Sequence, residues 1–146
     1  MNAREIHAKT ILSTSKIYSY VINPYLGCQH GCYYCYARFM KRYSGHQEAW
    51  GNFVDIKINA AELLQKEIRK KKRAEVWISS VCDPYQPLEA RYQLTRKCLY
   101  ILSDHHWPVI IQTRSSLVLR DIEIFKKAKN WKVGLTITTA DDEIRR

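Results

Sequence analysis

Strand-like apolar runs alternate with helical segments along most of this chain, and this alternation limits its possible folds more than any other feature. The runs are rich in β-branched and aromatic residues, and apolar residues at helical spacing separate them. We expect strands at residues 17–22, 54–58, 75–81, 109–113 and 132–138. Strands that alternate with helices form parallel βα units, so the sequence predicts an α/β fold.

Three segments carry apolar residues at the spacing of a helix that buries one face. They are residues 61–68, 94–102 and 118–125. We expect the second to begin near Thr95 and to stop before Trp107, and the third to have Ser116 as its N-cap. The first ends in a basic run at residues 69–73, whose charges are favourable at a helix C-terminus. The three helices are expected to cover one surface of the sheet.

The chain has 146 residues, which is enough for one domain with a hydrophobic core. It contains no internal repeat and no linker. The strand pattern fits either an open sheet or a curved half-barrel. Residues 141–146 read as the first turn of a helix, so we expect a longer domain that continues beyond them.

The charge of the chain favours polyanionic partners. Lys and Arg number 24 against 14 Asp and Glu, which gives a formal net charge of +10. Such an excess raises the affinity for nucleic acid through counterion release, although it also occurs in proteins that bind only small anions. No stretch approaches the roughly 20 apolar residues that cross a bilayer, and the five cysteines suit a reducing compartment, so we expect a cytoplasmic protein without membrane contact.

Three cysteines, Cys28, Cys32 and Cys35, share one loop with the spacing C-x3-C-x2-C. Thiolates are soft ligands that suit iron-sulfur clusters and zinc. A compact loop of this kind can hold three irons of a [4Fe-4S] cluster and leave the fourth open. The alternative is a zinc site that includes His30, in a basic nucleic-acid-binding module without catalysis, although a Cys-x-His-x-Cys loop crowds adjacent ligands.

The cysteine loop resembles the motif of the radical SAM superfamily, in which an aromatic residue precedes the last cysteine, as Tyr34 does here. Residues 82–87 (CDPYQP) and 117–121 (LVLRD) resemble the branch that contains spore photoproduct lyase. The resemblance covers about residues 23–139 and implies a partial TIM-like barrel with about four βα units. Residues 1–146 would be the N-terminal part of a radical SAM core domain truncated at its C-terminus, with residues 1–16 as an N-terminal extension.

This resemblance implies an enzyme with a [4Fe-4S] cluster and S-adenosylmethionine as cofactors. Such an enzyme reductively cleaves S-adenosylmethionine to a 5′-deoxyadenosyl radical, with electrons from a reductase such as flavodoxin or ferredoxin. It makes nucleic acid a candidate substrate, and the chain alone is expected to be incomplete for turnover. The sheet edge that a half-barrel exposes would also allow a homodimer.

Ligands of parallel βα folds bind beyond the carboxyl ends of the strands. By resemblance, Ser80 would contact the methionine moiety, Arg114 its carboxylate and Thr138 the ribose, with the backbone around Tyr34 and Tyr36 beside adenine. The sequence identifies no catalytic residue.

Other readings of these residues stay open. Asp83 follows the same strand as Ser80 and is a further candidate for cofactor binding. Ser80 and Thr138 could equally serve as strand-end hydrogen-bonding groups, and Arg114 as a surface cation. Among the remaining cysteines, Cys98 is expected in the core, and Cys82 as a buried thiol rather than a functional one.

Overall fold

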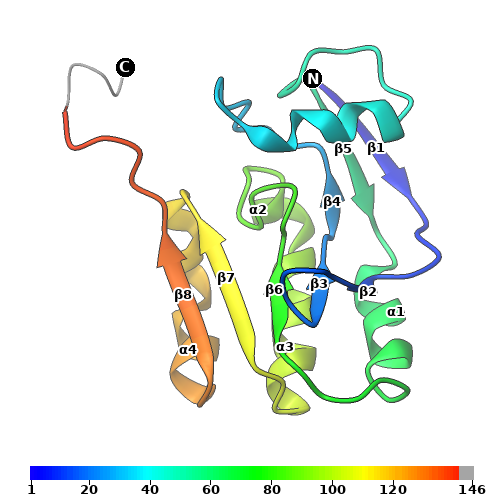
Figure 1. The fold of residues 1–146 in the computed structure, drawn as a ribbon, viewed down its shortest axis with the longest axis vertical. Coiled ribbons are helices and arrows are strands. Elements are labelled where there is room, and N and C mark those ends of the chain that lie inside the picture. Colours follow the sequence, from blue (N-terminus) through cyan, green and yellow to red (C-terminus); the bar gives the residue numbers. More distant parts are fainter. Residues whose placement is uncertain (142–146) are drawn as a thin grey trace.

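The computed structural model describes residues 1–141, and its larger sheet has five strands in the order β2-β3-β6-β7-β8 (Figure 1). Their bounds are Leu12–Thr14, Tyr20–Ile22, Val76–Ile78, Val109–Thr113 and Trp131–Leu135. Strands β3, β6, β7 and β8 run parallel, and β2 pairs antiparallel with β3. The predicted α/β fold with about four parallel strands is therefore confirmed, and over residues 1–141 the sheet is open.

A smaller sheet has the order β1-β5-β4, with bounds Asn2–Ile6, Phe53–Lys57 and Tyr25–Leu26. Its middle strand, β5, corresponds to the strand expected at residues 54–58. The expectation that this strand belongs to the parallel βα series was wrong, because β5 pairs with β1 and with the short β4 that precedes the cysteine loop. The proposed N-terminal extension at residues 1–16 contains β1 and β2, and its boundary stays a prediction.

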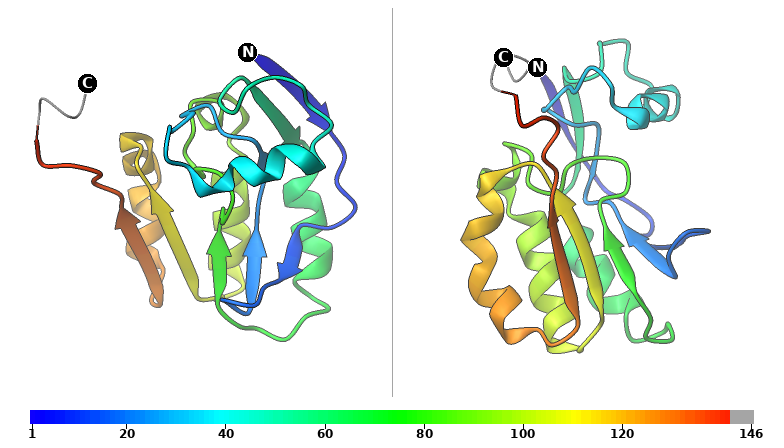
Figure 2. Two further views of the ribbon diagram at one scale, coloured as in Figure 1. Left: turned by 45° about the horizontal axis from the view of Figure 1, so that its top comes forward. Right: turned by 60° about the vertical axis from the view of Figure 1, so that its left-hand side comes forward.

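Three helices, α1 (Ala60–Glu67), α3 (Leu94–Asp104) and α4 (Ile122–Lys127), lie against one face of the larger sheet (Figure 2). The main core fills the space between these helices and the strands. Its fully buried side chains include Leu12, Ile22, Leu64, Ile78, Cys98, Leu99, Leu102 and Ile111. The single covered face and the core position of Cys98 are as predicted.

Several element ends differ from the sequence-based expectations. The third helical segment starts as a 3-10 helix, η2 (Ser116–Asp121), and its N-cap is Ser115, whose hydroxyl accepts a hydrogen bond from the N–H of Leu117 at 3.2 Å. Helix α1 ends at Glu67, so the basic run at 69–73 follows the helix instead of forming its last turn. The helical turn expected at residues 141–146 falls, from residue 142 on, outside the described residues.

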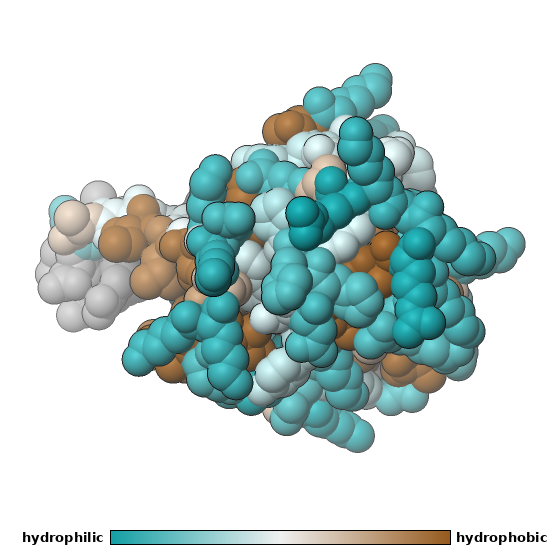
Figure 3. Space-filling view, turned by 90° about the horizontal axis from the view of Figure 1, so that it is seen from below, coloured by the Kyte–Doolittle hydropathy of each residue, from teal (hydrophilic) through white to brown (hydrophobic). Residues whose placement is uncertain are grey.

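The two ends of the parallel strands form two different poles. The cysteine loop, the 3-10 helix η1 (Tyr36–Tyr43) and α2 (Glu89–Tyr92) gather at the carboxyl ends of the strands (Figure 1). Seen from below, the opposite pole is covered mainly by hydrophilic side chains (Figure 3). Within residues 1–141, no helix is long and apolar enough to cross a membrane.

Candidate functional site

A cavity of about 300 Å³ opens between the cysteine loop and the carboxyl ends of β6, β7 and β8. Eight of the nine site residues predicted from the sequence line it. They are Cys28, Cys32, Cys35, Tyr34, Tyr36, Ser80, Asp83 and Arg114. The fold thus brings together residues that are up to 86 positions apart in the chain, from Cys28 to Arg114.

Thr138 is the predicted residue that the cavity lining does not include, and its side chain is exposed. Strand β8 ends at Leu135, and Thr136 lines the cavity instead. The Thr136 hydroxyl accepts a hydrogen bond from Gln112 Nε2 at 3.1 Å, and its N–H donates to the Thr113 carbonyl at 2.8 Å. The ribose contact assigned to Thr138 stays a prediction, and Thr136 is the hydroxyl that lies in the cavity wall.

The three loop cysteines are free thiols with different surroundings. Cys28 is buried, its Sγ accepts the N–H of Asp83 at 3.4 Å, and burial raises the pKa of its thiol to about 11. Arg114 Nη1 lies 2.8 Å from Cys32 Sγ and 3.3 Å from the Tyr34 hydroxyl. As these side chains are placed, no three His, Cys, Asp or Glu residues in the described part of the chain are arranged to hold a metal ion.

The donor set nevertheless fits an iron-sulfur cluster by its chemistry. Three thiols from one loop line one cavity, and thiolates are the ligands that such clusters use. Ligation by all three would require each thiol to lose its proton, and burial opposes this at Cys28.

Three buried polar atoms without a hydrogen-bond partner belong to residues that line the same cavity. They are His30 Nε2, Trp77 Nε1 and Ser79 Oγ. Because buried polar groups are nearly always paired, unpaired ones beside one cavity favour a ligand that binds there. Burial lowers the pKa of His30; Asp83 opposes this shift, and the charge of Arg114 adds to it.

Asp83 joins three parts of the site through its carboxylate. Oδ1 accepts hydrogen bonds from the Thr113 hydroxyl at 2.6 Å and from the N–H of Tyr85 at 2.8 Å. Oδ2 accepts the N–H of Arg114 at 2.9 Å and lies 3.6 Å from His30 Nε2. Both oxygens are thus engaged by the protein, which makes Asp83 a group that positions its neighbours; its predicted contact with the cofactor stays a prediction.

Gln86 holds the cysteine loop from behind, a role that the sequence did not reveal. Its side chain is buried, Oε1 accepts the N–H of Gln29 at 2.9 Å, and Nε2 donates to the Gly27 carbonyl at 3.3 Å. In return, Gln29 Oε1 accepts the N–H of Leu88. The sequence block at residues 82–87 had marked this region as part of the family resemblance. It could not show that the Gln86 amide is buried, because that depends on the tertiary structure.

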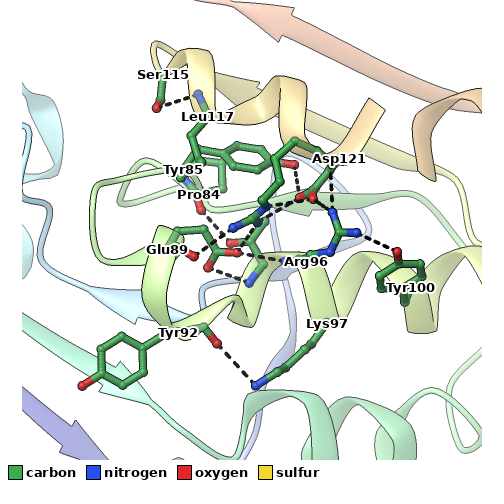
Figure 4. Close-up of polar contacts among 12 residues, drawn as sticks. Pro84, Tyr85, Glu89, Tyr92, Arg96, Lys97, Tyr100, Ser115, Leu117 and Asp121 are labelled. Carbon is green, nitrogen blue, oxygen red and sulfur yellow. Dashed lines mark hydrogen bonds and ion pairs between the residues drawn. The ribbon is translucent and has the colours of Figure 1, made fainter. Parts of the chain in front are cut away.

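A buried ionic network lies behind this loop and includes two of the blocks quoted above (Figure 4). Glu89 and Asp121 are fully buried, and both are paired with Arg96 or Arg120. The Tyr85 hydroxyl donates to Asp121 Oδ2 at 2.9 Å. Because buried carboxylates are stable only when paired, this network fixes η2 to the loop that follows β6. The blocks at residues 82–87 and 117–121 therefore meet in one interior.

Cys82 is half-buried and lines the cavity, in agreement with a largely buried thiol. Its Sγ lies 3.6 Å from the Tyr25 carbonyl. Burial, followed by the nearby Cys28, raises the pKa of its thiol, so Cys82 stays protonated at neutral pH.

Comparison with known proteins places this chain in a wider group. The family model of the radical SAM superfamily matches residues 22–146. An uncharacterized protein of Methanocaldococcus jannaschii is 39% identical over 144 residues, which cover 97% of this chain and 54% of that protein. An uncharacterized protein of Mycobacterium bovis is 30% identical over 136 residues, which cover 88% of this chain and 40% of that protein. The chain therefore spans about half the length of the curated relatives it matches, or somewhat less.

Among solved structures, this chain is similar to a variant of spore photoproduct lyase with bound AdoMet and dinucleoside spore photoproduct. The TM-score is 0.62 with 14% sequence identity, and the match covers 91% of this chain and 38% of the other. At this identity the likeness concerns the fold. It agrees with a partial radical SAM core whose sheet is mostly parallel.

Proposed function

This chain belongs to the radical SAM superfamily, and on that premise we propose that Cys28, Cys32 and Cys35 bind a [4Fe-4S] cluster beside a site for S-adenosylmethionine. One observation carries the proposal: a single cavity collects the three free thiols together with a cation and hydroxyl groups at the strand ends. When bound, the cluster would supply the electron that cleaves S-adenosylmethionine to a 5′-deoxyadenosyl radical.

Arg114 is the residue best suited to bind the carboxylate of S-adenosylmethionine. Its guanidinium reaches the cavity from the end of β7, and a planar guanidinium can form two parallel hydrogen bonds with a carboxylate. Among residues 1–141, its side chain donates to Cys32 Sγ and the Tyr34 hydroxyl and forms no ion pair with a carboxylate. Asp83 fixes the Arg114 backbone and thereby aims this side chain at the cavity.

The remaining cavity groups match the other parts of the cofactor. Ser80 follows β6 and accepts a hydrogen bond on its Oγ from Asn23 at 3.4 Å, so its hydroxyl proton is available to the methionine moiety. Thr136, or Thr138 as the sequence predicted, offers a hydroxyl to the ribose. Tyr34 and Tyr36 form the wall beside adenine, and the Tyr36 hydroxyl donates to the Ser80 carbonyl, which ties that wall to β6.

A nucleic-acid substrate completes the proposal. The chain has a formal net charge of +10, and the similar lyase structure has a dinucleoside photoproduct bound. A reductase such as flavodoxin or ferredoxin would donate the electron. A lyase-like reaction, and a homodimer through the β8 edge that exposes Val133 and Leu135, are parts of the proposal that concern the whole protein.

The test is reductive cleavage of S-adenosylmethionine by the anaerobically reconstituted chain. With dithionite as reductant, we expect 5′-deoxyadenosine, measured by chromatography with mass detection. Cys32→Ala should abolish the product, whereas Cys98→Ala, which alters a core thiol outside the cavity, should retain it. A colourless protein that retains zinc and forms no 5′-deoxyadenosine would support the zinc module instead.

A further inference from the structure

The 3-10 helix η1 and the residues just before it expose aromatic rings next to the cavity. Tyr33 is 90% exposed, Tyr43 66% and Phe39 44%. We call Tyr33, Arg38, Phe39, Lys41, Arg42 and Tyr43 the η1 surface. Exposed apolar side chains that gather in one segment are a feature of surfaces that bind a partner.

Cations lie between these rings and stack on them. The Arg38 guanidinium is 5.3 Å from the centre of the Tyr33 ring, and the Arg42 guanidinium is 5.5 Å from that of Phe39 and 4.9 Å from that of Tyr43. A shallow cavity of about 480 Å³ on this surface is lined by three cations and by no carboxylate residue. In the described part of the chain, Arg38 and Lys41 donate to backbone carbonyls and none of the three cations forms an ion pair, so the η1 surface combines flat rings with positive charge.

We propose that the η1 surface binds single-stranded nucleic acid, with bases stacked on Tyr33, Phe39 and Tyr43 and phosphates held by Arg38, Lys41 and Arg42. This inference rests on the proposed function, since it assigns a binding surface to the substrate class. Aromatic rings accept any base face, and cations along the same path follow the backbone. Arg also stacks on bases through its planar guanidinium.

The exposed rings favour nucleic acid over an acidic protein. Carboxylates of an acidic electron carrier would need only the cations, and they would gain nothing from rings that are 44% to 90% exposed. A single strand of nucleic acid uses both features, because its bases stack on the rings and its phosphates bind the cations.

The surface also leads to the cavity. Arg38 Nη2 donates to the Cys32 carbonyl at 3.3 Å, and Tyr34 and Tyr36, which neighbour Tyr33, line the cavity. Nucleic acid bound to the η1 surface would thus pass the cofactor site.

The other basic segment, residues 69–73, differs in its surroundings. It follows the C-terminus of α1, where positive charge offsets the negative end of the helix. It lies in the loop between α1 and β6, toward the pole seen in Figure 3, and contains no aromatic residue, although Lys71 Nζ lies 5.4 Å from the centre of the Tyr20 ring. Lys70 therefore serves as the control for general electrostatic attraction.

The test is fluorescence anisotropy of a labelled oligothymidylate of about 12 nucleotides, titrated with the cluster-loaded full chain. Tyr43→Ala and Phe39→Ala should each raise Kd roughly 5- to 100-fold, as expected for the loss of one stacked base, and Tyr43→Phe should restore binding. Arg42→Ala should reduce the slope of log K against log salt by about 0.7. Two variants serve as controls. Tyr100→Ala removes an exposed ring on α3, Lys70→Ala removes a cation away from η1, and neither should change the Kd for the oligothymidylate.

Each variant is also assayed for iron content, thermal unfolding and 5′-deoxyadenosine formation without nucleic acid. We expect these to be unchanged, because Phe39, Arg42 and Tyr43 do not line the cofactor cavity. Oligonucleotide binding without any 5′-deoxyadenosine would refute the proposed function and leave this inference standing. Absence of binding at low salt would overturn the inference, and so would binding that depends on Arg42 but not on the rings, the behaviour of a site for an acidic protein.

Discussion

The Thr113 hydroxyl donates a 2.6 Å hydrogen bond to Asp83 Oδ1, which joins the end of β7 to the loop that follows β6. The other carboxylate oxygen accepts the N–H of Arg114, and the Asp83 N–H donates to the Cys28 sulfur. One residue thus connects the predicted carboxylate-binding cation to the cysteine loop. The relative position of these two groups depends on Asp83.

Asp83→Asn tests this connection. The amide keeps one acceptor oxygen, but its NH₂ group faces donors that were bound by the second oxygen, which costs about 1–3 kcal/mol of unfolding free energy. We also expect weaker binding of S-adenosylmethionine, measured by calorimetry on the cluster-loaded protein. The exposed Asp104, on the last turn of α3, supplies the control Asp104→Asn, and equal effects of the two variants would contradict the assigned role.

Gln86→Ala should loosen the cysteine loop. It leaves the Gln29 N–H and the Gly27 carbonyl without their partners, so we expect a loss of about 1–3 kcal/mol in urea unfolding. The variant should also lose iron faster to a chelator. The control is Gln65→Ala, which removes an amide without these contacts from the exposed side of α1. Equal rates of iron release from the two variants would show that the Gln86 hydrogen bonds do not stabilise the site.

Gly27→Ala should be strongly destabilising. Gly27 has φ +94°, and an added Cβ would clash with the Phe53 carbonyl oxygen, so strain and crowding together should cost about 2–4 kcal/mol. Gly45 also has a positive φ, +72°, but a Cβ there meets nothing within 4 Å. Gly45→Ala should therefore cost only about 1 kcal/mol, and the difference between the two midpoints of denaturation measures the clash.

A cluster of ion pairs at the smaller sheet should weaken in acid. A hydrogen bond from Asn2, supported by His46, lowers the pKa of Glu48 to about 2. Burial would raise the pKa of Asp55, but hydrogen bonds from Arg4 and His46 outweigh it and lower that pKa. His46 lies between the two carboxylates, 3.2 Å from Glu48 and 2.9 Å from Asp55.

Because these folded-state pKa values lie below the unfolded ones, the stabilisation is complete above about pH 4.5 and is lost as the pH falls toward about 2. Unfolding in urea at a series of pH values measures this loss. Glu48→Gln should reduce the pH dependence in that window. An unchanged profile would show that the Glu48 contacts do not contribute.

The fold could be predicted where the sequence pattern reflects burial. Strand β7 was predicted to the residue, since Val109 and Ile111 belong to a continuous apolar run. Strand β1 was missed, because four of its five residues are exposed, three residues in it are polar or charged, and its existence depends on backbone pairing with β5. The end of β8 was placed too late, since the β-branched residues up to Thr138 continue the strand pattern after the pairing with β7 has ended.

The site, too, was predictable where the sequence pattern reflects it and was not predictable where it depends on tertiary contacts. The spacing of Cys28, Cys32 and Cys35 was sufficient to predict a common loop, and the strand-end rule brought Ser80 and Arg114 to it. Gln86 could not be predicted, because a buried amide and an exposed one look the same in sequence. The contact between Arg114 and Cys32 likewise depends on the packing of β7 beside β6.

Iron and acid-labile sulfide per chain, measured after anaerobic reconstitution, test the central claim most directly. We expect about four of each in the unaltered chain and a marked loss in Cys28→Ala, Cys32→Ala and Cys35→Ala, with Cys98→Ala unchanged. A full complement in any of the three loop variants, or a chain that binds zinc and takes up no iron, would contradict it.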